Sequence, residues 1–236
     1  TYSDTIRMLR RMEKFEAYGK KEPLVKSYKP PTVNQPHIWS LPKTSPLRQY
    51  TNIQHELDCA NLFVAYWLTG LMKYWDYAWQ EGEVKDFNVE THRVYYDRRM
   101  VVNDAWFMWE VDRDTEPYGV PLKDFLDEGK HIRFPKPTDD TRNTLAGKIG
   151  KYVPFFNDNG DNLDFRVLFT IQSWQYGAYD EDATWRRLQN ARKLFAKCDH
   201  PELFWFAHHR NLLADPLGAH FYPAGDGDPV TILDLC

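Results

Sequence analysis

Side chains that are able to bind a metal gather in one short stretch of the C-terminal third of the chain. They are Cys198, His200, His208 and His209. A zinc site needs four such ligands at about 2.0–2.3 Å from one ion. If residues 200–208 are helical, however, His200 and His208 lie about 12 Å apart, too far to share an ion. His208 would share a helical face with Phe204 and Leu212, so we predict that it is a packed, hydrogen-bonded histidine and that the cluster holds no metal.

Other motifs with known chemistry fail on their spacing. Residues 156–164, FNDNGDNLD, look like a calcium loop, but the loop needs Gly at position six and Glu at position twelve. Counted from Asn157, those positions hold Asn162 and Leu168. We therefore predict a plain turn at Asn159–Gly160. The chain has no GxGxxG, Walker A or GxSxG motif, and Lys148 in AGKIGKY lacks phosphate-loop spacing. We predict no catalytic residue and no cofactor.

Charge is distributed unevenly along the 236 residues. Residues 1–50 hold ten Lys or Arg and four Asp or Glu, a net charge of +6, whereas the rest of the chain carries −10. A basic N-terminal segment on an acidic body attracts phosphate, anionic lipid or an acidic protein, and charge alone does not choose among them.

The elements that would position these residues are predicted to be mostly helices. Residues 4–18 have helical periodicity, and six prolines between Pro23 and Pro46 predict an extended arm. A long helix is expected over residues 52–81, capped by Thr51 and Gln54 and ended by Gly82. Its residues 59–72 carry no charge, which leaves three alternatives open: a buried helix, an interfacial helix or a membrane span.

The rest of the chain is predicted to continue this pattern. We expect helices over residues 90–112, 122–128, 182–198 and about 199–213, and a loop up to about residue 144. Residues 162–176 alternate as a strand would, but no partner strand is predicted nearby, so a helix is favoured. The predicted fold class is mainly α. Its domains are a basic N-terminal helix and arm (1–50), a helical domain with the long apolar helix (51–130) and a second helical region with an extended acidic tail (131–236).

Aromatic residues make up 16% of the chain, which is typical of large contact surfaces. The proline-rich arm, the aromatic segment 59–79, YYDRR at 95–99 and the tail at 208–225 together resemble lineage-specific accessory subunits of mitochondrial inner-membrane complexes. That resemblance, to subunits of respiratory complexes or ATP synthase, implies a non-catalytic structural role and assigns no functional residue. The predicted interface residues are Trp39, Trp67, Trp75, Trp79, Trp106 and Trp109.

The expected partners are other subunits of such a complex, with lipid contact through residues 59–79 as an option and without nucleic acid. The three cysteines have no CxxC spacing, which favours a reducing or matrix-like compartment, and we expect a mitochondrial, inner-membrane-associated protein. Two other hypotheses are kept. One is an enzyme whose site combines His92, His131, His208 or His209 with carboxylates, and the other is an RNA-associated subunit, for instance in a mitochondrial ribosome.

Overall fold

The computed structural model describes residues 26–28, 38–40, 53–77, 96–127, 129–134, 144–159, 165–175 and 178–236. The chain divides into two compact units, Thr1–Gln54 and His55–Cys236, and each is described by itself. The predicted helix over residues 4–18, most of the predicted arm, Trp79 and His92 lie outside the described residues. In the first unit, β1 (Lys26–Tyr28) and β2 (Ile38–Ser40) form an antiparallel pair in which Trp39 is opposite Ser27.

The second unit is built on a mixed sheet, so the prediction of a mainly α fold is wrong. Six strands lie in the order β10-β9-β6-β5-β4-β3. Their bounds are β3 Met72–Tyr77, β4 Arg98–Val102, β5 Ala105–Asp112, β6 Phe165–Ile171, β9 Phe204–His208 and β10 Phe221–Pro223. The three central strands β5, β6 and β9 are parallel, and the flanking pairs are antiparallel. The short strands β7 (Trp174–Gln175) and β8 (Ala178–Tyr179) form a separate hairpin.

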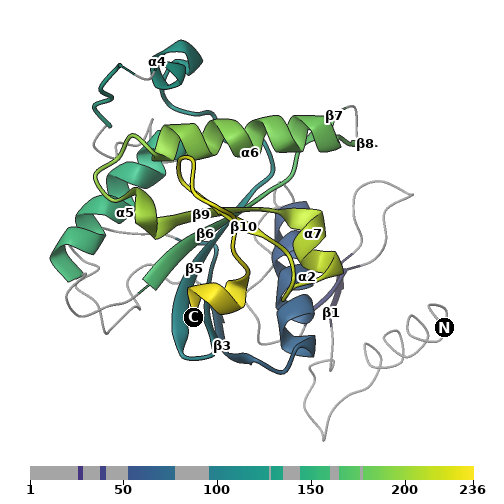
Figure 1. Ribbon diagram of the computed structural model, residues 1–236. Coiled ribbons are helices and arrows are strands. Elements are labelled where there is room, and N and C mark those ends of the chain that lie inside the picture. The colour runs from purple at the N-terminus through teal and green to yellow at the C-terminus, as the bar shows by residue number, and fades with distance from the viewer. Residues whose placement is uncertain are drawn as a thin grey trace, which may run out of the picture. The chain divides into compact units, whose positions relative to one another are not determined.

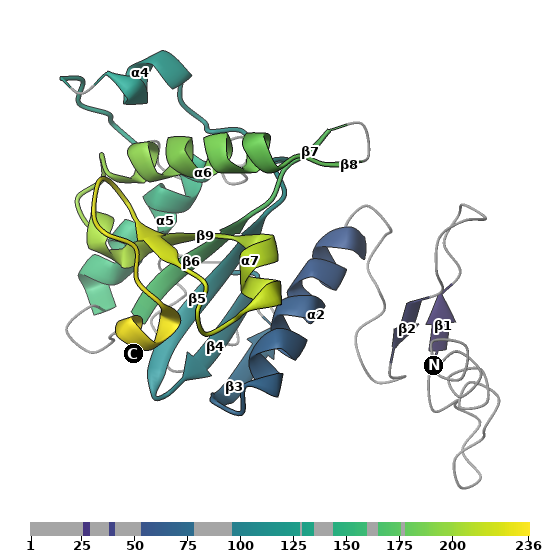
Figure 2. The ribbon, with the colours of Figure 1, turned by 45° about the vertical axis from the view of Figure 1, so that its right-hand side comes forward.

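Helices cover both faces of this sheet (Figures 1 and 2). They are α2 (Ile53–Leu68), α5 (Leu145–Asn159), α6 (Glu181–Phe195) and α7 (His209–Ala214), with 3₁₀ turns η2 (Pro201–Leu203) and η3 (Ile232–Leu235). The short helix α4 (Leu122–Leu126) packs against α6. The connections β5–α5–β6 and β6–α6–β9 step across the sheet in one direction, and both helices pack on one face. The other face is covered by α2, α7 and η3.

The expected helix over residues 52–81 is the clearest correction. The helix α2 ends at Leu68, because Thr69 and Gly70 form a turn with Gly70 at a φ of 73°, and β3 follows. The Thr69 hydroxyl donates to the carbonyl of Tyr66 and accepts from the amide of Leu71, which holds the turn. A glycine in the left-handed conformation is a common helix stop. The continuing aromatic run KYWDY belongs to a strand.

The expected helix over residues 90–112 is also wrong, because residues 98–112 form the β4–β5 hairpin. Its two-residue turn is Asn103–Asp104, with φ angles of 47° and 73°. Both values are positive, as a tight hairpin turn of the type I′ class requires, and Asn and Asp tolerate them. All five residues of β4 are buried, so its apolar positions do not alternate with polar ones as they would in a half-exposed strand.

The C-terminal third mixes confirmed and corrected predictions. Helices over 122–128 and 182–198 are confirmed as α4 and α6. The favoured helix over 162–176 is instead the strand β6, whose neighbours β5 and β9 come from distant parts of the sequence. The expected helix up to residue 213 is split into η2, β9 and α7.

Two hydrophobic cores follow from the two covered faces. Toward α5 and α6, the sheet presents Phe169, Phe204 and Phe206 to Leu188 and Phe195. Toward α2 and α7, a second core is centred on Trp109, which is fully buried. Its other large members include Leu62, Tyr66, Phe107, Leu212 and Phe221. Because both faces are packed, the central strands carry polar side chains mainly toward their carboxyl ends, where the candidate site lies.

Candidate active site

The last four residues of β5 alternate between the two faces of the sheet. Trp109 and Val111 enter the core beneath α2, so Glu110 and Asp112 point to the opposite face. Glu110 is 1% exposed and Asp112 is fully buried. Two carboxyl groups are therefore taken out of water at adjacent same-face positions, which is costly unless each one has charged or hydrogen-bonding partners.

The helix α5 supplies the partners of Glu110. Lys148 Nζ lies 2.6 Å from Glu110 Oε2 and 2.9 Å from Glu116 Oε1. One turn further along α5, the Tyr152 hydroxyl donates to Glu110 Oε1 at 2.5 Å. Residues four positions apart share a helical face, so Lys148 and Tyr152 contact the two oxygens of the Glu110 carboxyl group from the same side. We call Glu110, Lys148, Tyr152 and Glu116 the Glu110 cluster.

Burial and charge act in opposite directions in this cluster. Burial raises the pKa of Glu110 to about 7, even though the charge of Lys148 acts to lower it. Burial acts to lower the pKa of Lys148, but the carboxylates of Glu110, Glu116 and Asp97 outweigh it and raise that pKa well above its ordinary value. Lys148 is therefore a fixed positive charge at neutral pH, whereas Glu110 is able to gain and lose a proton there.

Asp97 brings a partly exposed carboxylate to the same place. It directly precedes β4, and its Oδ2 accepts a hydrogen bond of 2.8 Å from the amide of Val111. Its Oδ1 lies 3.0 Å from Nε2 of His55 on α2, and the two side chains are 25% and 20% exposed. Burial opposes the charge on both groups, yet their mutual attraction lowers the pKa of Asp97 to about 2 and raises that of His55 to about 11.

His55 also lies next to Cys59, which raises the question of a nucleophilic triad. Cys59 Sγ is 3.8 Å from His55 Nε2, the same ring nitrogen that faces Asp97. A relay needs the nucleophile and the carboxylate on different ring nitrogens. Burial also raises the pKa of the Cys59 thiol. This arrangement is therefore a partly exposed ion pair with a buried thiol beside it and not a triad.

A second ion pair ties the loop after β5 to α6. Arg187 Nε lies 2.7 Å from Asp112 Oδ2, and Arg187 Nη1 lies 3.1 Å from Asp114 Oδ1. Arg187 also donates to the carbonyl of Glu116. The guanidinium thus fixes the course of the backbone between Asp112 and Glu116, and with it the carboxylate that contacts Lys148.

Further polar groups meet at the ends of β6 and β9. Gln172 donates to Asp58 on α2, and Arg113 Nε lies 3.1 Å from Asp58 Oδ2 without hydrogen-bond alignment. His209 Nδ1 is 3.3 Å from the Thr170 hydroxyl. Burial lowers the pKa of His209 to about 4, so this ring is uncharged at neutral pH. Like Glu110, the residues Arg113, Gln172 and His209 lie at or near the carboxyl ends of parallel strands, which is where open α/β sheets bind their ligands.

The predicted interface tryptophans lie in different environments. Trp67 is 62% exposed on α2, and Trp109 is fully buried within its own chain. Trp106 is half-buried, with the guanidinium of Arg99 5.0 Å from its ring centre. Trp75 lies in β3 opposite Met100, and Trp39 lies in β2.

The histidines and Cys198 do not come together at one site among the described residues. His208 and His209 are buried side by side at the end of β9, and His131 is exposed. His200 contacts Asn157 and Glu202, and Cys198 is a free thiol. Because residues 204–208 form a strand, the helical spacing assumed for His200 and His208 does not apply.

Sequence reasoning missed Glu110, Lys148, Tyr152 and Asp97. One signal was available: Glu110 is the only charged residue in the run AWFMWEV, and a charge inside an apolar run is either paired or functional. Its partners come from residues about 40 positions away, so no local pattern identifies them.

Comparison with protein-family models, with curated proteins and with solved structures found no match for this chain. Among the described residues, no helix has the length and apolar character needed to cross a membrane. The same part of the chain contains no group of three or more His, Cys, Asp or Glu placed to hold a metal ion.

Proposed function

We propose that the Glu110 cluster is an acid–base centre that hydrolyses phosphodiester bonds of a nucleic acid. The observation that carries the proposal is the contact between Lys148, a fixed positive charge, and Glu110, whose pKa of about 7 suits proton transfer at neutral pH. Glu110 lies near the carboxyl end of the parallel strand β5, and Lys148 lies near the start of α5, at the edge of the sheet where ligands bind.

The chemistry assigns one role to each group. Glu110 takes a proton from a water molecule as the water oxygen attacks phosphorus, and the bond between phosphorus and the leaving sugar oxygen breaks. The protonated Glu110 then returns the proton to that oxygen. Lys148 stabilises the extra negative charge that the phosphoryl oxygens carry in the transition state. The reaction consumes one water and needs no oxidant or reductant.

Access to the cluster is controlled by Glu116. Lys148 and Glu110 are almost fully buried, but the Glu116 side chain is 24% exposed and its carboxylate lies on the Lys148 ammonium. In the proposal a phosphate oxygen of the substrate displaces this carboxylate. Burial raises the pKa of Glu116, so giving up its charged position on Lys148 is less costly than for an ordinary carboxylate.

The substrate class follows from the N-terminal unit. The acidic body argued against nucleic acid, but residues 1–50 carry a net charge of +6 and are able to attract a phosphate backbone. A single-stranded oligonucleotide is the simplest substrate that offers both the polyanionic backbone and the scissile phosphodiester.

The test is cleavage of end-labelled single-stranded DNA and RNA by the purified full chain, with Mg²⁺ and with a chelator. We expect cleavage whose rate rises around pH 7, and a fall of about a hundredfold or more in kcat/KM for Glu110→Gln. Glu116→Gln should lower KM, and Glu202→Gln, at an exposed residue outside the cluster, should behave as the unchanged chain. The proposal is overturned if no oligonucleotide is cleaved in either buffer, or if folded E110Q cleaves at the original rate.

A second candidate function is the non-catalytic subunit of a mitochondrial inner-membrane complex, a respiratory complex or ATP synthase. It is favoured by one patch on α2, where Val64, Trp67 and Leu68 are 50%, 62% and 78% exposed. Comigration of the endogenous protein with a large complex on a native gel would support it. Comigration should be lost in a Trp67→Glu, Leu68→Glu variant, and a monodisperse monomer at all concentrations would argue against it.

A further inference from the structure

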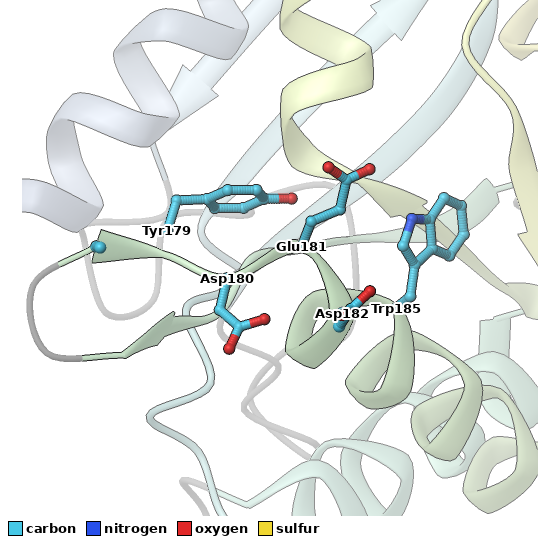
Figure 3. A pocket seen from close by; sticks show the side chains of 6 residues that line it. Tyr179, Asp180, Glu181, Asp182 and Trp185 are labelled. Carbon is cyan, nitrogen blue, oxygen red and sulfur yellow. The ribbon is translucent and has the colours of Figure 1, made fainter.

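A cavity of about 520 Å³, wide open to the surface, lies at the start of α6 and shares no residue with the Glu110 cluster. It is lined by Ala178, Tyr179, Asp180, Glu181, Asp182 and Trp185. Figure 3 shows the Glu181 carboxylate between the rings of Tyr179 and Trp185. Its volume is within the range of small-molecule sites, about 300–1,000 Å³.

The two rings are held in place by packing around His208. The His208 ring lies 5.8 Å from the ring of Tyr179 and 5.3 Å from that of Trp185, and its Nε2 is hydrogen-bonded to the Tyr179 hydroxyl. Trp185 also packs edge-on against Tyr222 at 5.6 Å. The aromatic walls are therefore fixed before any ligand arrives, which lowers the entropy cost of binding.

His208 lies behind the two rings and is not itself one of the residues that line the cavity. It is 3% exposed, and within the described residues its Nδ1 has no hydrogen-bond partner. Burial lowers the pKa of His208 more than the nearby Glu181 carboxylate raises it, so the ring adds no positive charge beside the cavity at neutral pH. A buried nitrogen without a partner is unusual in a finished core.

Of the three carboxylates that line the cavity, one caps a helix and the other two form no ion pair with a described residue. Asp180 caps α6, because its Oδ1 accepts from the amide of Ala183 at 2.8 Å. Glu181 and Asp182 are exposed, and neither forms an ion pair with another described residue. Acidic residues at a helix N-terminus interact favourably with the helix dipole, but that interaction alone explains neither the cavity nor its aromatic walls.

One cation of the chain already contacts an aromatic ring of the lining. The guanidinium of Arg210, on α7, lies 3.5 Å from the centre of the Tyr179 ring. Aromatic faces attract cations, and the attraction strengthens where carboxylates stand nearby and water is displaced. Tyr179 thus already contacts one cation, and the Glu181 carboxylate lies beside the same ring.

We propose that this cavity binds an alkylammonium group, whose charge pairs with Glu181 and whose carbon chain packs between the rings of Tyr179 and Trp185. Two sources share this chemistry, a free polyamine and a lysine side chain of a peptide. The proposal does not depend on the proposed phosphodiester hydrolysis, because the two sites have no residue in common.

The test is titration of the full chain with n-butylammonium, spermidine and N-acetyl-lysine methylamide, followed by calorimetry and by the indole N–H signal of Trp185 in NMR spectra. That signal is assigned by its loss in Trp185→Phe. We expect saturable binding of n-butylammonium and none of neutral n-butanol. Stronger binding of spermidine would identify a polyamine, and stronger binding of the lysine derivative would identify a peptide.

The variants keep the proposal falsifiable. Glu181→Gln changes an exposed side chain, so the fold should persist, and affinity for n-butylammonium should fall about fivefold or more. Glu202→Gln, on the exposed turn η2, removes the same charge outside the cavity and should leave affinity unchanged. Absence of saturable binding by all three amines, equal binding of n-butanol, or unchanged affinity in E181Q would overturn the proposal.

Discussion

Replacing Glu110 by Gln should flatten part of the pH dependence of folding. The pKa of Glu110 is about 7 in the folded chain and 4.5 in its ordinary state, so between these pH values the folded state binds a proton that the unfolded state has lost. The free energy of unfolding therefore falls as pH rises from 4.5 to 7. One pKa unit corresponds to about 1.4 kcal/mol, so the loss assigned to this carboxyl group is about 3 kcal/mol.

The assay is urea unfolding of the original chain and of E110Q at several pH values between 4.5 and 8. Other titrating groups are common to both proteins, so the difference between their free energies isolates Glu110. We expect E110Q to be less stable relative to the original chain at pH 4.5 than at pH 8, by about 3 kcal/mol. Glu202→Gln, at an exposed residue outside the cluster, leaves Glu110 and its partners in place and should keep the slope. Parallel curves for E110Q and the original chain would refute the reasoning, because the carboxyl group would then have the same pKa in both states.

Three further predictions concern the surrounding residues. The imidazole of His55, with a pKa of about 11, should stay protonated at pH 8 in NMR spectra, and the stability it contributes should be lost as pH rises from 6.5 toward 11. Arg187→Met should lower the free energy of unfolding by about 3–5 kcal/mol, because it leaves buried Asp112 unpaired; a D112N/R187M double variant that is no better than the sum of the single losses would contradict this. In urea unfolding, Trp109→Ala should cost about 3–5 kcal/mol and exposed Trp67→Ala within about 0.5 kcal/mol, and equal losses would contradict the burial described above.

The elements that sequence predicts correctly are those with local signals at both ends. The helix α6 begins at a capping Asp180, has acidic residues in its first turn and basic residues in its last, and was predicted within a few residues. The helix α4 follows Pro121 and was predicted in the same way. In both cases the residues that decide the structure are neighbours in the chain.

The strands were misread because their signal depends on how many faces are buried. A strand covered on one face alternates between apolar and polar residues, but β4 and much of β5 are buried on both faces, so the end of β4 (Met100–Val102) and most of β5 read as apolar runs without alternation. Such runs do not distinguish a strand from a buried helix. For β6 the alternation was visible, but its partners β5 and β9 are more than 30 residues away, so the pairing that stabilises it was not.

The candidate site also combines features that have a local sequence signal with features that depend on contacts between distant residues. By itself the sequence determined the basic N-terminal segment, the helices with local caps and the placing of one charged residue, Glu110, inside an apolar run. Only the tertiary structure decided that Lys148 and Tyr152 meet this residue, and that Glu181 stands between two aromatic rings. The physical reason is that burial sets both the cost of a charge and the identity of its partners. Burial depends on contacts between residues far apart in the chain.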